Sequence, residues 1–137
     1  MQVEVVWHED NGGLRGWVEV VNDDAEVLRL PGKPSIHPLA VDGSSLEVRH
    51  LITLEMRSPG FVDLLPGQRA RAAITWGGWD GPAASGEVVV GWRDPADHGD
   101  ISARTVQTTV AVRGPNQPRG TAGGSNTSSS WFELLLP

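Results

Sequence analysis

The segment 62–76 constrains the fold of this chain more than any other, because it joins a tight turn to a strongly alternating strand. Pro66 presets the φ angle that the second residue of a turn needs, and Gly67 accepts the positive φ that follows in a type II turn. Beyond the turn, one side of the segment is apolar, while the other begins with two arginines. The apolar positions are Ala70, Ala72, Ile74 and Trp76. This period of two predicts a half-buried antiparallel strand and hence a domain built from β-strands.

Short alternating segments of the same kind recur along the chain, separated by Gly, Pro, Asn and Asp residues that favour turns. The predicted strands are 2–7, 14–21, 26–30, 35–41, 46–56, 69–76, 87–92, 101–112 and 131–136. No segment has a sustained period of 3.6 residues with helix caps. The pattern therefore predicts an all-β chain that folds as a two-sheet β-sandwich.

The chain has 137 residues, which predicts a single domain over 1–137. Its 17 glycines and 10 prolines suit short strands and turns better than long helices. There is no internal repeat. The Gly-, Ser- and Pro-rich stretch 114–130 is expected to be a mobile loop inside this domain.

A formal net charge of −6 argues against nucleic acid as a partner, because such binding needs a basic footprint. The chain has no cysteine, which excludes disulfides and a cysteine nucleophile. No signal-peptide pattern and no apolar run long enough to span a membrane occurs. We expect a cytoplasmic location if the chain is full length, and an extracellular or cell-envelope location if it begins at a domain boundary.

The residues point to no catalytic, cofactor or metal site. The four histidines lack the spacing of paired metal ligands, and the serines lie in loops without a nucleophile elbow. The densest group of carboxylates lies in the loop 94–100. Its spacing fits no EF-hand, so a solvated hairpin tip and a weak calcium site both stay open there.

The tryptophans are the best candidates for recognition, because an exposed indole can stack on a sugar ring or anchor a protein partner. Trp76 ends a predicted strand, and Trp79 and Asp80 follow in the Gly-rich loop 77–82. We therefore assign partner binding to Trp76, Trp79 and Asp80. The alternative is that Trp79 folds back as a lid over one end of the sandwich. Trp17, Trp92 and Trp131 also lie within predicted strands and are expected in the core or on a sheet face.

Four elements in order resemble the DUF4232 family, an actinobacterial domain of unknown function. They are Val18–Asn22, Leu30–Ile36, Val41–Gly43 and the Leu65–Gln68 turn with the strand that ends at Trp76. The resemblance covers roughly residues 14–92 and depends on the shared order of the elements. This chain departs from the family by lacking the cysteines that many members contain.

The resemblance implies an immunoglobulin-like sandwich, which we expect to have about 7–9 antiparallel strands. It also implies an extracellular or cell-envelope setting, and it supplies no catalytic residues. The expected function is a non-catalytic module that recognises a protein, with strand addition at a long edge strand as a second route. The alternatives are a carbohydrate-binding module with an exposed tryptophan and a homo-oligomeric structural subunit. An enzyme with an unrecognised carboxylate site is a further alternative that nothing positive supports.

Overall fold

The computed structural model describes residues 1–10, 13–39, 49–50, 61–77, 84–95, 101–110 and 126–136, and all regular structure in them is β-strand. The predicted all-β class is therefore confirmed. Eleven strands are assigned: β1 (Gln2–Asp10), β2 (Gly13–Val21), β3 (Leu28–Leu30), β4 (Ser35–Leu39), β5 (Arg49–His50), β6 (Val62–Leu64), β7 (Arg69–Gly77), β8 (Ala84–Trp92), β9 (Ser102–Val110), β10 (Asn126–Ser129) and β11 (Glu133–Leu135).

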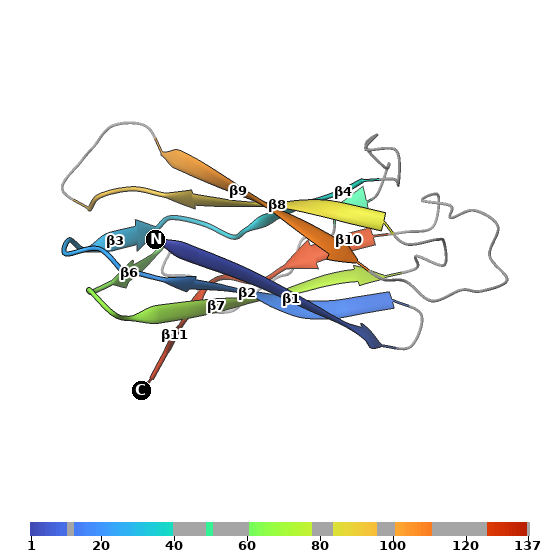
Figure 1. Ribbon diagram of the computed structural model, residues 1–137, viewed down its shortest axis with the longest axis horizontal. Coiled ribbons are helices and arrows are strands. Elements are labelled where there is room, and N and C mark those ends of the chain that lie inside the picture. The colour runs from blue at the N-terminus through green and yellow to red at the C-terminus, as the bar shows by residue number, and fades with distance from the viewer. Residues whose placement is uncertain are drawn as a thin grey trace, which may run out of the picture.

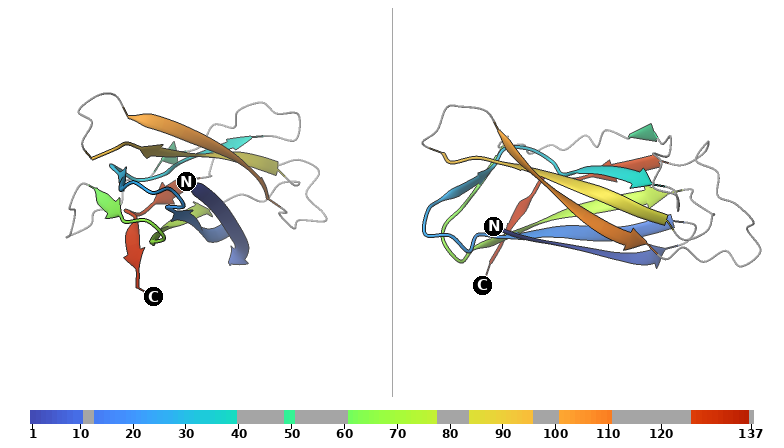
Figure 2. Two further views of the ribbon diagram at one scale, coloured as in Figure 1. Left: turned by 60° about the vertical axis from the view of Figure 1, so that its left-hand side comes forward. Right: turned by 45° about the horizontal axis from the view of Figure 1, so that its top comes forward.

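The strands form two layers that face each other across one core (Figures 1 and 2). One layer has the order β1-β2-β7-β10-β5, and β11 pairs with β7 further along the same edge. The other layer contains β4-β8-β9, with the pair β3-β6 joined to it by a bridge between Arg29 and Arg93. All pairings are antiparallel except the one between β10 and β5. The arrangement is a β-sandwich.

The alternation predicted for β7 is confirmed residue by residue. Its buried positions are Ala70, Ala72, Ile74 and Trp76, each at most 1% exposed. The positions between them face solvent or are half-buried. The opposite layer contributes Ile36, Val88 and Val90 to the same core. Fully burying a Val, Leu or Ile side chain contributes about 1.5–3 kcal/mol, so this shared core is the main source of stability for the pair of sheets.

The turn before β7 is also confirmed. Gly67 has a φ of 85°, which an alanine would adopt only with strain. The Gln68 amide donates to the Leu65 carbonyl at 3.0 Å, and the Gln68 side chain accepts from the Leu65 amide at 2.9 Å. The Gly67 amide donates to the Asn22 carbonyl at 2.7 Å, which ties the turn to the end of β2.

The Asn22 side chain lies at 0% exposure under this turn and uses its donors and acceptor fully. Its Nδ2 donates to the carbonyl oxygens of Glu26 at 2.8 Å and Leu64 at 2.9 Å. Its Oδ1 accepts from the Asp24 amide at 3.0 Å. A buried amide with all its groups paired fixes the local backbone, because each carbonyl that it satisfies would otherwise lack a partner away from water.

The prediction of a mobile loop over 114–130 is wrong for its last residues, because Asn126–Ser129 form β10. Thr127 pairs with Trp76 of β7 and is 2% exposed, while Ser128 and Ser129 pair with Thr75 and Ile74. Asn and Ser have a low intrinsic preference for strands, but pairing with a central strand overrides that preference. Of the predicted strand 46–56, only Arg49 and His50 are described, and the rest lies outside the described residues.

Candidate functional site

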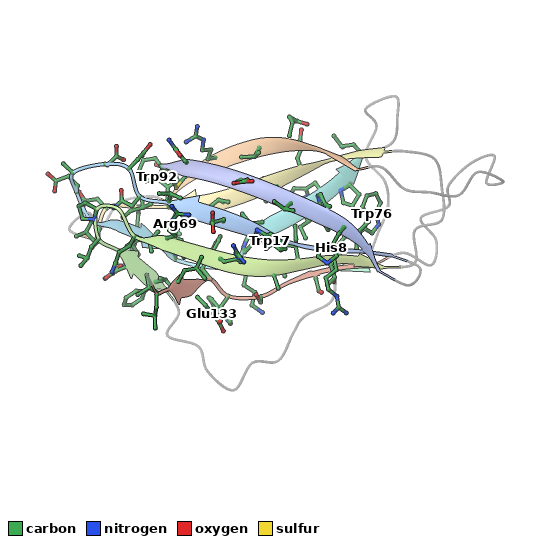
Figure 3. The ribbon with its side chains drawn as sticks, turned by 60° about the horizontal axis from the view of Figure 1, so that its bottom comes forward. His8, Trp17, Arg69, Trp76, Trp92 and Glu133 are labelled. Carbon is green, nitrogen blue, oxygen red and sulfur yellow. The ribbon has the colours of Figure 1, made fainter. Side chains whose placement is uncertain are left out.

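The predicted recognition residues divide into a buried residue and two that the structure does not describe. Trp76 is 1% exposed and packs in the interior, opposite Leu14 of β2 and Thr127 of β10 (Figure 3). It belongs to the core of the sandwich. Trp79 and Asp80 lie outside the described residues, as does most of the acidic loop 94–100.

Large exposed hydrophobic side chains lie on or beside β6 and β11, two strands that contact each other. Five occur among the described residues, and four of them flank or belong to β6 and β11. These four, which we call the apolar corner, are Phe61, Leu65, Leu134 and Leu136. The two strands pack beside each other near the C-terminal end in Figure 1. Ile101, the fifth, precedes β9 in the other layer.

A groove of about 710 Å³ adjoins the apolar corner. One wall is the turn 66–68, and the other is the run Leu134–Leu136. Between them lie Glu19, Arg69 and Arg71 on the outer face of β2 and β7. The volume falls within the usual range of about 300–1,000 Å³ for binding pockets, so the groove can hold several side chains of a partner.

Among the residues that line this groove, the exposed charged side chains are arginines. The Glu19 side chain is 12% exposed, and it accepts a bond from Arg71 at 3.1 Å and lies 3.8 Å from Arg69. The two arginine side chains are 42% and 59% exposed, respectively. Glu133 stands opposite Arg71 in register but does not line the groove. Two guanidinium groups thus border an apolar surface in a chain with a net charge of −6.

Trp17 holds the position of Arg71 on the outer face of the sheet. The Arg71 guanidinium lies 4.6 Å from the centroid of the Trp17 ring, and His8 lies on the same face with its ring centroid 6.1 Å from that of Trp17 (Figure 3). One face of the indole is therefore covered by a cation. All five described tryptophans are at least half-buried, so none of them forms the open, flat platform on which sugars stack.

An ion pair borders the apolar corner next to Phe61. The Arg29 guanidinium contacts both Asp63 oxygens, at 2.7 and 2.9 Å, and lies 3.9 Å from the centroid of the Phe61 ring. Arg29 and Asp63 are register partners on β3 and β6. The bond from Arg29 holds the pKa of Asp63 below its usual value of 3.8, and the charge of Arg93 acts in the same direction.

This lowered pKa makes part of the stability dependent on pH. Because the folded carboxyl has the lower pKa, its contribution is complete above about pH 4 and is lost as the pH falls through the folded pKa. We expect Asp63→Asn to be less stable than the wild type at neutral pH, with the difference shrinking below about pH 4. Urea unfolding at a series of pH values checks this. A difference that stays constant down to about pH 2.5 would contradict it.

A second, smaller groove of about 310 Å³ lies between β4 and β10. Two of its hydroxyls are engaged within the protein: Ser129 Oγ donates to the Pro34 carbonyl at 2.8 Å, and the Ser128 and Thr75 hydroxyls lie 2.5 Å apart. It has less than half the volume of the groove beside β11.

The described residues contain no group of three His, Asp or Glu side chains placed to hold a metal ion. Nor does this part of the chain include a helix long and apolar enough to cross a membrane. No family model, curated protein or solved structure matches this chain.

The apolar corner is not among the predicted recognition residues, although the sequence contains one signal for it. Leu134, Leu135 and Leu136 are consecutive, and successive side chains of a strand point to opposite faces. Such a run must expose at least one leucine unless both faces are covered. Leu65 follows β6, and the contact of β6 with β11 depends on strand pairing that the sequence does not reveal.

Proposed function

We propose that this domain is a non-catalytic recognition module that binds a protein partner through the apolar corner and the adjoining groove. The observation that supports this most is that four of the five large exposed hydrophobic side chains among the described residues lie on or beside β6 and β11, two strands in contact, and that exposed arginines line the adjoining groove. Contiguous apolar surface rimmed by polar groups is typical of interaction sites. Arginine and aromatic residues, here represented by the exposed Arg69, Arg71 and Phe61, are also enriched at protein interfaces.

A carbohydrate ligand remains the second candidate, with the loop at Trp79 and Asp80 as its site. It is less favoured because the described groove is lined by leucine and arginine, and the described tryptophans are half-buried or buried. A homo-oligomeric subunit is a third candidate, since an exposed apolar corner also suits contact between copies. The cell-envelope setting that we propose follows from the resemblance to DUF4232 alone.

Site-specific photo-crosslinking tests the proposal. A benzoylphenylalanine placed at Leu134 in cells that naturally make the protein is expected to give a discrete protein adduct. The matched control is the same group at Thr105, an exposed position on β9 in the other layer. Identical adducts at the two positions, or none at Leu134, would contradict a binding surface at the apolar corner.

Two further readouts separate the alternatives. An adduct with twice the mass of the chain would favour the homo-oligomer, and sedimentation would then show association that Leu134→Asp abolishes. Binding on a glycan array that survives Leu134→Asp but is lost in Trp79→Ala would favour the carbohydrate module.

A further inference from the structure

We infer that the apolar corner and its groove recognise a short segment of a partner protein in which apolar side chains accompany carboxylates. The inference deepens the proposed function and depends on it, because it names the chemistry of the partner that the same surface binds. It is based on the exposed arginines of the groove and on the volume and apolar lining of the groove. A comparison with a homodimer through the same surface also supports it.

The charge of the groove selects for an anionic partner. Arg69 is the more exposed of its two arginines, and its closest carboxylate contact is Glu19 at 3.8 Å. Arg71 is restrained by Glu19 and Trp17, so it presents a fixed guanidinium toward the groove. A guanidinium is suited to a carboxylate because its planar fork can donate two parallel hydrogen bonds. Arg69 retains most of this donor capacity toward solvent.

The size and lining of the groove select for a short segment with apolar side chains. A volume of about 710 Å³ accommodates a few side chains and is bordered by Leu134, Leu135 and Leu136. Leu134 is 40% exposed and Leu136 is 84% exposed, so binding would remove a large apolar surface from water. A highly charged segment without apolar residues would leave that surface exposed and would bind only through screened charges.

A second copy of this chain fits the same surface less well. In a two-fold dimer the same patch meets itself, so both copies would bring Arg69 and Arg71 into one interface. Like charges placed together across an interface oppose binding. The carboxylates near these arginines offer little compensation across such an interface. Glu19 is 12% exposed and already paired with Arg71, and Glu133 does not line the groove.

The test uses the whole chain and three synthetic peptides of about twelve residues, labelled for fluorescence anisotropy. The first alternates Asp or Glu with Leu or Val, the second has Lys in place of the acids, and the third has Ser in place of the apolar residues. We expect the first peptide to bind about tenfold more tightly than either of the others. Its preference over the Lys peptide should fall as salt is raised, because only that difference comes from charge.

Variants locate the binding on the protein. Arg69→Glu and Leu134→Asp are each expected to weaken binding of the acidic apolar peptide about tenfold. Ile101→Asp is the matched control, because Ile101 is 55% exposed in the other layer, and it should leave binding unchanged. Arg69 has 59% of its side chain exposed, so its replacement is expected to leave the fold intact, which thermal unfolding checks.

Several results would overturn the inference. They are equal binding of the acidic and basic peptides, equal binding of the Ser-substituted peptide, absence of binding by all three, or equal weakening by Ile101→Asp and Leu134→Asp. Dimerisation that Leu134→Asp abolishes would overturn it in favour of a second copy. The proposed function fails separately: a specific adduct at Leu134 with no peptide preference would reject only the acidic segment, whereas absence of any adduct would reject the surface itself.

Discussion

Replacing Gly16 with alanine is expected to lower the free energy of unfolding by about 3 kcal/mol or more, a large effect for the addition of one methyl group. Gly16 lies in β2 opposite Trp7 of β1. A Cβ at this position would overlap the carbonyl oxygen of Val6 and lie 2.9 Å from its carbonyl carbon and 3.1 Å from Trp7 Cα. All three atoms belong to the backbone of the paired strand. They can move only if β1 shifts away from β2, which breaks ladder hydrogen bonds.

Urea unfolding followed by tryptophan fluorescence measures this effect, with two glycines as controls. Gly32→Ala adds a methyl group with no atom within 4 Å. Gly91→Ala, in β8, meets the side chain of Ile101 at 3.1 Å, which is able to move. We expect each control to cost less than about 1 kcal/mol. A Gly16→Ala variant as stable as these controls would show that β1 does not approach β2 closely at this position.

Replacing Asn22 with aspartate is also expected to lower the free energy of unfolding strongly, although the two side chains have nearly the same shape. At neutral pH we expect a loss of about 3 kcal/mol or more. The Nδ2 donor would become an oxygen facing the carbonyl oxygens of Glu26 and Leu64. A carboxylate at this fully buried position would therefore be repelled by two carbonyl dipoles and removed from water.

The stability that Asn22→Asp loses is expected to depend on pH. Burial and the two carbonyl oxygens raise the folded pKa of the introduced carboxyl above its unfolded value of about 4. The variant is then closest to the wild type below about pH 4, where the carboxyl is protonated and can donate one bond. Its stability falls as the pH rises toward the raised pKa.

Chemical unfolding of Asn22→Asp at several pH values checks both the size and the direction of the effect. Asp24→Asn is the matched control, because the same chemical exchange occurs two residues away on a side chain that is 67% exposed. It should change stability by no more than about 0.5 kcal/mol. An Asn22→Asp variant that gains stability relative to the wild type with rising pH would refute the role assigned to the buried amide.

Much of the fold could be predicted because strand alternation is a local property. Val18 and Val20 of β2, and Ala70, Ala72 and Ile74 of β7, occupy the buried face that period two predicts. The Pro66–Gly67 turn could also be predicted, since Pro fixes its own φ and Gly permits a positive φ regardless of the rest of the chain. The short strands β6 and β10 were missed because their residues form strands only when a partner strand lies beside them.

The candidate site was much less predictable. A tryptophan at the end of a strand can point into the core or into solvent. Trp76 lies in the core, where Leu14 of β2 and Thr127 of β10 are its register partners. The groove depends on the turn 66–68 and Leu134–Leu136 lying next to each other. These segments are far apart along the chain, and no local sequence pattern predicts that they lie close together in space.

By itself, the sequence determined an all-β chain, the inward face of its main strands and the turn that begins β7, because these depend on neighbouring residues and their backbone preferences. The tertiary structure decided which segments meet. Asn22 satisfies the carbonyl of Leu64, 42 residues away, and β11 pairs with β7 so that Phe132 is buried while Leu134 and Leu136 remain exposed. Such long-range contacts follow from strand pairing and burial across the whole chain, and the candidate binding surface exists only through them.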